Sequence, residues 1–450
     1  MFIFLGYHKL LMGLDNFWYL KVLCDITIVV KTLTEMSMGL SFEQKLRNYA
    51  RLGLLHGLGM DQKIRPLYIE SYQIEDHNHF IPIMAEEAYK IGVQTVDVRY
   101  RYPELERVMM RDAPEEFKLY FPGWITDGAK RIIERDGARI ALNGNGDLGV
   151  MDDVDSKYSS RLKSAFMKAN EPYSTLRMKM LRPWSILDVP TKAWAKKLGM
   201  NVRELWEFLF SVTGADQKDC LKFAQTVNEQ LHRRCDLLNK LGIATLHFVG
   251  DKTDLRVGLS PRARWLGGRK QSEDGTWFEP NWPSFEVFTT PDWRKTEGSV
   301  TMTLPSVLDG PIVENLRVWF SAGRAVHSEA TAGNAAFKDL ITTDASACQL
   351  GEIALVGFDS PLAKYAYPHF CGLLDENKRC HLAFGEAYPA ALEGGTTATR
   401  EELVELGCNE SDIHHDMMIS DRHTSVTAYD ASGKRLAQLI SGGCWIGEFT

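Results

Sequence analysis

The sequence predicts a chain of mixed class, in which an N-terminal α/β domain with a parallel sheet precedes a C-terminal α+β domain with a largely antiparallel sheet. Two observations lead to this expectation. From about residue 42, stretches with helical spacing of apolar residues alternate with short apolar runs, the pattern of a βαβ unit. Beyond residue 243, short β-rich runs separated by Gly, Pro and Asp dominate, which is typical of antiparallel strands joined by turns.

The N-terminal α/β domain is expected over residues 41–195. Its first elements are predicted as the helix "FEQKLRNYARLGLL", the strand "RPLYIESY", the helix "HFIPIMAEEAYKIG" and the strand "VQTVDVRY". A strand followed by a helix and a second strand is the repeating unit of a parallel sheet.

The C-terminal domain is expected over residues 196–450 and opens with two helical stretches, "NVRELWEFLFSVTG" and "KDCLKFAQTVNEQLHRRCDLLNKLG". Strand-like runs follow, among them "IATLHFVG", "DLRVGL", "SFEVFTT", "NLRVWFSAG", "GEIALVG" and "SVTAYDASGKRLAQLI". One or two helices between them complete the α+β pattern.

Residues 1–40 are apolar, yet they make a poor membrane span. Charged residues interrupt the segment before about 18 uncharged apolar residues accumulate, at Lys9, Asp15, Lys21 and Asp25. The segment also lacks the basic start and the small-residue cleavage site of a signal peptide. We interpret it as an N-terminal extension or a miscalled start, with Met36 or Met38 as the native beginning.

The composition excludes several classes of protein. The chain has 450 residues, of which 44% are hydrophobic and 25% charged, as in ordinary globular proteins. A formal net charge of -7 argues against nucleic acid as the main partner, so a peptide or small molecule is expected. Eight cysteines without a C-x-x-C pair exclude a zinc ribbon or a thioredoxin motif and favour reduced thiols in a cytoplasmic protein.

A Gly-rich stretch, "GNGDLG" at residues 144–149, matches the pattern of a dinucleotide-binding loop. A helix with apolar periodicity should follow such a loop, but the acidic "VMDDVDSK" follows here and would repel a pyrophosphate. We therefore expect a Gly-rich turn and no dinucleotide cofactor.

The stretch "SDIHHDMMIS" at residues 411–420 carries the first candidate metal ligands. In a strand, alternate side chains share a face, so Asp416 is expected beside His414, while His415 points away. Such a pair presents an imidazole nitrogen and a carboxylate to one point, as a divalent metal requires. Taken alone, the motif is more typical of a surface ion pair, because three-letter patterns recur by chance.

Further candidate residues lie in "CGLLDENKRCHLAFGEAYP", which contains Glu376, His381, Glu386 and Tyr388. A turn followed by a strand would place His381 on an ordered element and Glu376 on the adjacent loop. In isolation, a histidine bonded to the backbone and a solvated glutamate explain the two residues equally well.

Two more acids, Glu286 in "PSFEVFTTPD" and Glu352 in "LGEIALVG", stand inside apolar, β-prone runs. A buried ionised carboxylate costs several kcal/mol unless it is paired or binds a metal, although an outward-facing strand position would also accommodate it. Four carboxylates and two histidines in one domain match the mixed oxygen and nitrogen ligands of a two-metal hydrolase.

These motifs resemble the M29 family of metallo-aminopeptidases, also called the aminopeptidase T family. The matching stretches are "VPTKAWAKKLG", "TDLRVGLSPRARWLGG", "PSFEVFTTPDWRKTEGSV", "LGEIALVGFDSPLAKYAYPHFCGLLDENKRCHLAFGEAYP" and "IHHDMMI". The resemblance covers most of the chain from about residue 180, and more loosely from residue 42. The family usually reads H-x-D-F-M-I-G where this chain has Met417 and Ser420, changes that leave the ligands intact.

The resemblance implies an aminopeptidase that uses a metal-activated water to remove N-terminal residues from peptides with a free N-terminus. It implies two divalent metal ions (Zn, Co or Mn), with Glu352 as the bridging ligand, Tyr388 at the catalytic centre, and a homodimer with an enclosed active site. The ligands carried over are Glu286, Glu352, Glu376, His381, His414 and Asp416. Tyr388 would donate a hydrogen bond to the tetrahedral oxyanion, while the general base stays open between Glu286 and Glu352.

Two rival sites use fewer of these residues. His381, His414 and Asp416 alone form the triad of a mononuclear Fe(II) ring-cleaving dioxygenase, and a branch similar to this family cleaves dihydroxypyridine rings with such a site. The three further glutamates have no role around one iron, which favours the hydrolase. A structural metal site would be four-coordinate with sulfur or imidazole ligands, which this carboxylate-rich set fits poorly.

Overall fold

The computed structural model describes residues 39–144, 150, 153–154, 161–162, 165–166, 168–171, 173–308, 311–365 and 368–450. All but the last two residues of the expected extension 1–40 lie outside this part of the chain, and so do residues 145–149 of the Gly-rich stretch. Among the described residues, no helix has both the length and the apolar character needed to cross a membrane.

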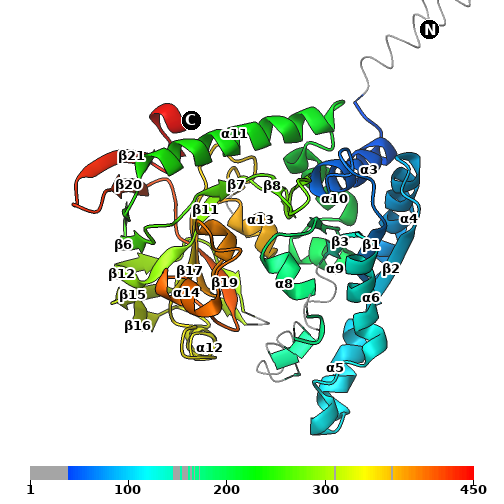
Figure 1. The fold of residues 1–450 in the computed structure, drawn as a ribbon, viewed down its shortest axis with the longest axis horizontal. Coiled ribbons are helices and arrows are strands. Elements are labelled where there is room, and N and C mark those ends of the chain that lie inside the picture. The colour runs from blue at the N-terminus through cyan, green and yellow to red at the C-terminus, as the bar shows by residue number, and fades with distance from the viewer. Residues whose placement is uncertain are drawn as a thin grey trace, which may run out of the picture.

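Five parallel strands form the N-terminal sheet, as the sequence predicts (Figure 1). Their order across the sheet is β10-β4-β3-β1-β2, and every neighbouring pair is parallel. Their bounds are β1 Leu67–Tyr72, β2 Val96–Arg101, β3 Ala138–Asn143, β4 Trp184–Asp188 and β10 Asn281–Trp282. The edge strand β10 comes from far along the chain, where it follows the first strands of the C-terminal part.

Helices cover both faces of the N-terminal sheet. They are α3 (Phe42–Arg51), the π-helical turn η1 (Leu52–Gly57), α4 (Glu75–Lys90), α5 (Pro103–Asp112), η2 (Glu115–Phe117), α6 (Gly123–Glu134), α8 (Tyr173–Met178), α9 (Lys192–Lys197) and α10 (Val202–Thr213). Capping boxes fix the starts of α3 and α10, where Ser41 pairs with Gln44 and Asn201 with Glu204.

The two faces of this sheet differ in polarity. One face carries Leu67, Ile69 and Ile140, which are buried against α3, α4 and η1 in a single core. Because side chains alternate along each strand, the opposite face carries Tyr68, Glu70 and the charged residues paired with them on β2 and β3. The sheet is therefore apolar on the face that packs against α3, α4 and η1, and more polar on the face that packs against α6 and α8.

The C-terminal part contains two antiparallel sheets (Figure 1). The five-stranded sheet has the order β19-β18-β17-β11-β7, with bounds β7 Leu266–Gly267, β11 Val287–Thr289, β17 Leu350–Leu355, β18 His381–Gly385 and β19 His414–Met418. The eight-stranded sheet has the order β16-β15-β12-β6-β5-β20-β21-β22, with bounds β5 Thr245–Gly250, β6 Thr253–Leu259, β12 Pro291–Thr301, β15 Arg317–Ser321, β16 Arg324–Glu329, β20 Ser425–Tyr429, β21 Arg435–Ser441 and β22 Cys444–Trp445. The predicted fold class is confirmed.

The remaining elements connect these sheets. They are the strand pairs β8 (Lys270–Gln271) with β9 (Trp277–Phe278) and β13 (Ser306–Val307) with β14 (Ile312–Val313), the helices α11 (Cys220–Leu241), α12 (Asn334–Leu340), α13 (Gly372–Glu376) and α14 (Arg400–Glu405), and the turns η3 (Pro389–Ala391) and η4 (Gly447–Phe449). The long helix α11 runs along one side of the molecule, beside both the N-terminal and the C-terminal parts (Figure 1).

Packing between the two parts is continuous around residue 195. Leu205, Trp206 and Phe210 of α10 belong to the same hydrophobic core as the N-terminal sheet. Trp282 of β10 joins that core as well. The division at residues 195 and 196 stays a prediction, since elements on both sides of it share one core.

Candidate metal centre

Three neighbouring strands of the five-stranded sheet bring the candidate ligands together. Glu352 on β17 pairs with Ala383 on β18, and Ala383 pairs with Asp416 on β19. Residues directly opposite one another in neighbouring strands share a face of the sheet. A glutamate and an aspartate therefore flank the small side chain of Ala383, which leaves space between them.

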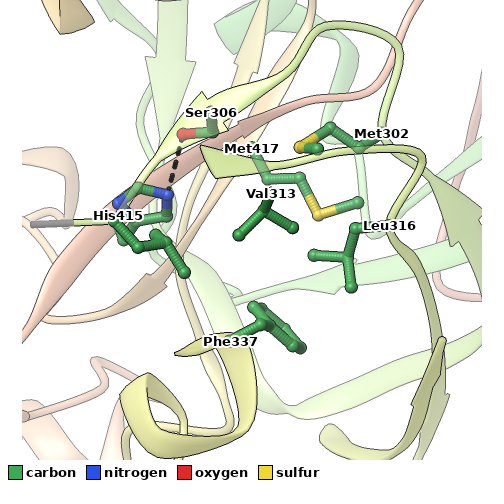
Figure 2. A pocket seen from close by; sticks show the side chains of 8 residues that line it. Met302, Ser306, Val313, Leu316, Phe337, His415 and Met417 are labelled. Atoms are coloured by element: carbon green, nitrogen blue, oxygen red, sulfur yellow. Dashed lines mark hydrogen bonds between the residues drawn. The ribbon is translucent and has the colours of Figure 1, made fainter. Parts of the chain in front are cut away.

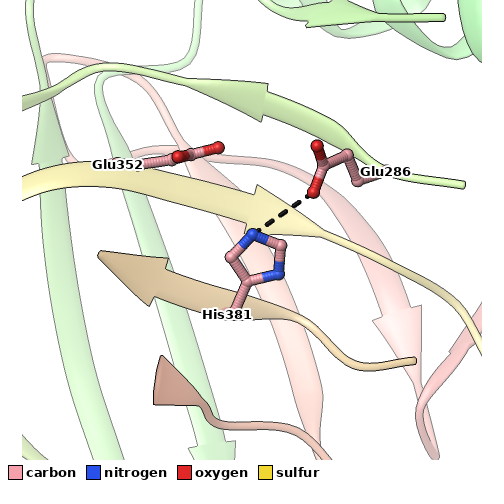
Figure 3. A group of neighbouring side chains, drawn as sticks. All are labelled: Glu286, Glu352 and His381. Atoms are coloured by element: carbon pink, nitrogen blue, oxygen red, sulfur yellow. Dashed lines mark ion pairs between the residues drawn. The ribbon is translucent and has the colours of Figure 1, made fainter. Parts of the chain in front are cut away.

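The first group of candidate ligands consists of Glu286, Glu352 and His381, whose ligand atoms lie within 4.8 Å of one another (Figure 3). His381 Nε2 lies 3.3 Å from Glu286 Oε2. The other ring nitrogen, Nδ1, lies 3.2 Å from the carbonyl oxygen of Arg379, which it meets as a donor when Nδ1 carries the proton. That bond leaves Nε2 free to act as a metal ligand.

The second group consists of Glu352, His414 and Asp416, again with ligand atoms within 4.8 Å of one another. His414 Nε2 lies 3.3 Å from Glu352 Oε2 and 3.6 Å from Asp416 Oδ1. His414 Nδ1 lies 2.8 Å from the carbonyl oxygen of Glu386. As in His381, a backbone carbonyl therefore orients the ring so that Nε2 faces the other ligands. Glu352 is common to both groups.

The two groups of ligands contain more carboxylates than histidines, and this excess of acidic groups favours the binding of a cation. Burial, together with the charges of Glu352 and Asp416 and against the opposing effect of His381, raises the pKa of Glu286 to about 7. Burial would lower the pKa of His414, but Glu352 and Asp416 raise it to about 9. Glu286 Oε2 is buried and accepts no hydrogen bond from the described residues. A carboxylate in that state fits a bound cation.

Glu376 is expected on a loop, but it is the last residue of the short helix α13. It lies outside both groups of three. Burial raises its pKa well above the usual value, and the nearby carboxylates of Glu286 and Asp416 raise it further. The structure therefore brings Glu376 into electrostatic contact with the cluster without placing it among the nearest ligands.

Tyr388 lies directly before the turn η3 and faces the second group. Its ring centroid is 5.2 Å from that of His414, at an interplanar angle of 68°. Burial, together with the charges of Glu352 and Asp416, raises the pKa of Tyr388 well above its usual value. The phenol therefore keeps its proton and can donate a hydrogen bond.

Strand alternation places His415 on the opposite face of β19 from His414, and Figure 2 shows its ring beside Ser306. Its Nε2 lies 3.1 Å from Ser306 Oγ. It borders a small apolar cavity of about 10 Å³ with Met302, Phe337 and Met417. The side chain thus takes part in the packing behind the strand, and it also reaches the lining of a larger cavity.

Replacing these two histidines separately is expected to give opposite results. His414→Ala removes a nitrogen from the second group and should lower the bound metal per subunit, whereas His415→Ala should keep the metal and cost about 1–3 kcal/mol of stability through lost packing. Elemental analysis of both purified variants checks this expectation. Equal metal loss in the two variants would contradict the assignment of the strand faces.

A cavity of about 970 Å³ opens on the second group of ligands. His414, His415 and Asp416 line it on one side, while Asn143 and Asp188 line it from the N-terminal sheet. The latter two residues end β3 and β4, so the carboxyl edge of the parallel sheet faces the metal-ligand cluster. Ligands of α/β proteins commonly bind at this edge.

Asp188 is a residue of this cavity that the sequence reasoning missed. It is 1% exposed and accepts a hydrogen bond from Cys371 Sγ at 3.1 Å. Burial raises its pKa to about 6, and its charge in turn raises the pKa of Glu376. The sequence pattern that could have identified Asp188 is its position as the acid that ends the apolar run "WSILD", at the carboxyl end of a parallel strand.

Comparisons with known proteins identify the family of this chain. The family model of the thermophilic metalloproteases (M29) matches residues 42–445. The chain belongs to the M29 family. Aminopeptidase T of Thermus thermophilus is 33% identical to this chain over 412 residues, which cover 90% of this chain and 99% of that protein. Aminopeptidase AmpS of Bacillus subtilis is 32% identical over the same shares of the two chains.

A solved M29 structure, that of wild-type AmpT from Thermus thermophilus, is similar throughout. The TM-score is 0.82 at 32% identity, and the match covers 90% of this chain and all of that one. The resemblance to the M29 family and the prediction of a metallo-aminopeptidase are confirmed. None of these relatives favours the iron dioxygenase.

Proposed function

We propose that this M29 protein is a dinuclear metal-dependent aminopeptidase that removes N-terminal residues from peptides through a metal-activated water. The observation that carries the proposal is the sharing of Glu352 by two adjacent groups of ligands. In two-metal hydrolases, a carboxylate between the ions holds them at the separation the reaction needs. Zn, Co and Mn all suit this set of carboxylates and imidazoles.

Glu286 and His381 would hold one ion, and His414 and Asp416 would hold the other. Glu352 would contact both ions. We assign Glu376 to the same centre because its carboxyl is within electrostatic reach of Glu286 and Asp416. Bound divalent ions would supply Lewis acidity and a water of lowered pKa. The two backbone carbonyl oxygens that accept from the histidine Nδ1 atoms fix the orientation of both rings.

The chain's own residues would handle the protons and the negative charge. Tyr388 would donate a hydrogen bond to the oxyanion that develops on the scissile carbonyl oxygen. Glu286 is one candidate for the general base, as a carboxylate ligand that loosens from its ion and accepts the proton of the water. Glu352 is the other candidate, at the cost of its bridging role.

Tyr388→Phe tests the first of these roles. Loss of one oxyanion donor is expected to lower kcat about 100-fold while KM and metal content change little. Steady-state kinetics and elemental analysis of the variant supply both numbers. A variant that loses its metal, or one that keeps full kcat, would remove Tyr388 from the reaction.

We further propose a homodimer located in the cytoplasm, acting on peptides with a free N-terminus. The seven cysteines of the described part of the chain are free thiols, which suits a reducing compartment. The relatives named aminopeptidase support the substrate class. Light scattering of the purified protein tests the dimer.

The test of the central proposal is metal content per subunit, measured on protein purified without chelator, together with hydrolysis of leucine p-nitroanilide. Two equivalents of Zn, Co or Mn and chelator-sensitive release of nitroaniline are expected. One equivalent of iron without amide hydrolysis would overturn the proposal in favour of the dioxygenase.

A further inference from the structure

The polar face of the N-terminal sheet carries a row of side chains along its carboxyl edge. Tyr72 on β1 pairs with Arg101 on β2, and Asn143 on β3 pairs with Asp188 on β4. The register of β1 with β3 pairs Glu70 with Ala141, and continuing it by two residues places Tyr72 beside Asn143. All four residues of this row line the large cavity, in the order Arg101, Tyr72, Asn143 and Asp188.

The row has a negative end and a positive end. Asp188 lies within electrostatic reach of Glu376, on the side of the metal-ligand cluster. Neighbouring strands are about 4.8 Å apart, so Arg101 lies about 14 Å from Asp188 across three strand spacings. An extended peptide rises about 3.4 Å per residue, so the row is about as long as four residues.

Among the described residues, three further arginines lie near Arg101 on or beside this sheet face, while Glu104 and Glu106 line the cavity next to it. Strand pairing places Arg99 and Arg139 on the same sheet face, and Arg177 of α8 interacts electrostatically with Arg139. Two carboxylates pair with this group. Glu106 bonds Arg101 through Nε at 3.0 Å and Nη2 at 2.7 Å, and Glu70 bonds Arg139 through Nη2 at 2.7 Å.

Arg99 has no such compensation. Among the described residues, its guanidinium stacks over the ring of Phe166 at 5.0 Å, and no carboxylate lies within ion-pair distance of it. Burial lowers the pKa of Arg99, and the like charges of Arg101 and Arg139 lower it further despite the proximity of Glu70. Within the described part of the chain, this group therefore holds four guanidinium groups and the two carboxylates Glu70 and Glu106, and an added anion would reduce the repulsion that Arg101 and Arg139 exert on Arg99.

Arg101 is held in a position to contact that anion. Its side chain is 37% exposed and lines the cavity. Glu106 takes two of its five N–H groups, and Tyr72 Oη accepts a third from Nη1 at 3.3 Å. Two N–H groups have no hydrogen-bond partner among the described residues, and the carboxylate of Glu106 fixes the plane of the guanidinium that presents them.

We propose that Arg101, supported by the guanidinium groups around it, binds the C-terminal carboxylate of a short peptide whose N-terminus lies at the metal centre. The substrate class is then unblocked peptides of about four residues or more, since the row alone is about four residues long. This inference rests on the proposed aminopeptidase function. It adds the position of the peptide chain along the carboxyl edge of the parallel sheet, and a preference for a free C-terminus.

The first test compares the peptide Leu-Gly-Gly-Gly with its C-terminal amide, which lacks the charge and is otherwise the same. The native protein should hydrolyse the acid with a kcat/KM about tenfold above that of the amide. In Arg101→Gln the ratio should fall to about one, and in Arg101→Lys it should fall between these values. The control is Arg111→Gln, an exposed arginine of α5 paired with Asp112, in which the ratio should stay as in the native protein.

The second test measures binding to chelator-treated protein by titration calorimetry, so it does not depend on hydrolysis. Acid and amide should differ about tenfold in Kd for the native protein and should bind alike to Arg101→Gln. Equal binding of acid and amide to the native protein would overturn the inference, and so would an undiminished preference in Arg101→Gln. A binding preference that persists without peptide hydrolysis would uphold the carboxylate site and reject the proposed function.

Discussion

Replacing Glu352 with glutamine is expected to release the bound metal and abolish peptide hydrolysis. Glu352 is the one residue that both groups of ligands contain. The neutral amide removes an anionic ligand from each group at once, leaving Glu286 and His381 in one group and His414 and Asp416 in the other. We expect less than one metal equivalent per subunit and a loss of kcat/KM on the order of 1000-fold or more.

Glu329→Gln is the matched control for this substitution. Glu329 is an exposed glutamate of β16 that lies in neither group of ligands. The Glu329→Gln variant should keep both the metal and the activity of the native protein. Retention of two equivalents in the Glu352 variant would contradict the bridging role and with it the dinuclear proposal.

Metal-free protein is expected to lose stability as the pH rises from about 5 to 9. Glu286 has a folded-state pKa of about 7, above its ordinary 4.5, so the folded protein favours the protonated carboxyl and loses that stabilisation as the pH rises through 7. His414 has a folded-state pKa of about 9, so its stabilisation is complete below 6.5 and is lost as the pH rises through 9. Each effect is worth on the order of 3 kcal/mol.

Metal-loaded protein should follow the opposite trend, because metal ions compete with protons for the same side chains. The stabilisation by metal should therefore grow with pH. Denaturant unfolding of chelated and metal-loaded protein between pH 5 and 9 measures the difference. A metal-free protein whose stability is constant or rises over this range would show that these groups are not protonated in the folded state.

Much of the fold is predictable because its patterns are local. The strand "RPLYIESY" and the helix "HFIPIMAEEAYKIG" correspond to β1 and α4, and their order indicates a parallel sheet. The strand β10 could not be predicted, since two residues carry no periodicity and their partner β4 lies over ninety positions earlier. The start of α10 is local again, because Asn201 and Glu204 form a capping box.

The candidate site is predictable only in part. The shared face of His414 and Asp416 follows from alternation within one strand. Their proximity to Glu352 depends on the register of three strands through Ala383, which no short pattern contains. Asp188 could not be assigned to the site either, because it reaches the cavity only through the packing of the two parts of the chain.

The strand β10 also constrains the order in which the molecule can be completed. Asn281 and Trp282 cover the open edge of β4, and Trp282 fills the core beneath it. During synthesis, the first four strands emerge long before these two residues leave the ribosome. A nascent chain that ends near residue 195 therefore carries an uncovered sheet edge, the kind of surface that chaperones protect and that aggregates when left unpaired.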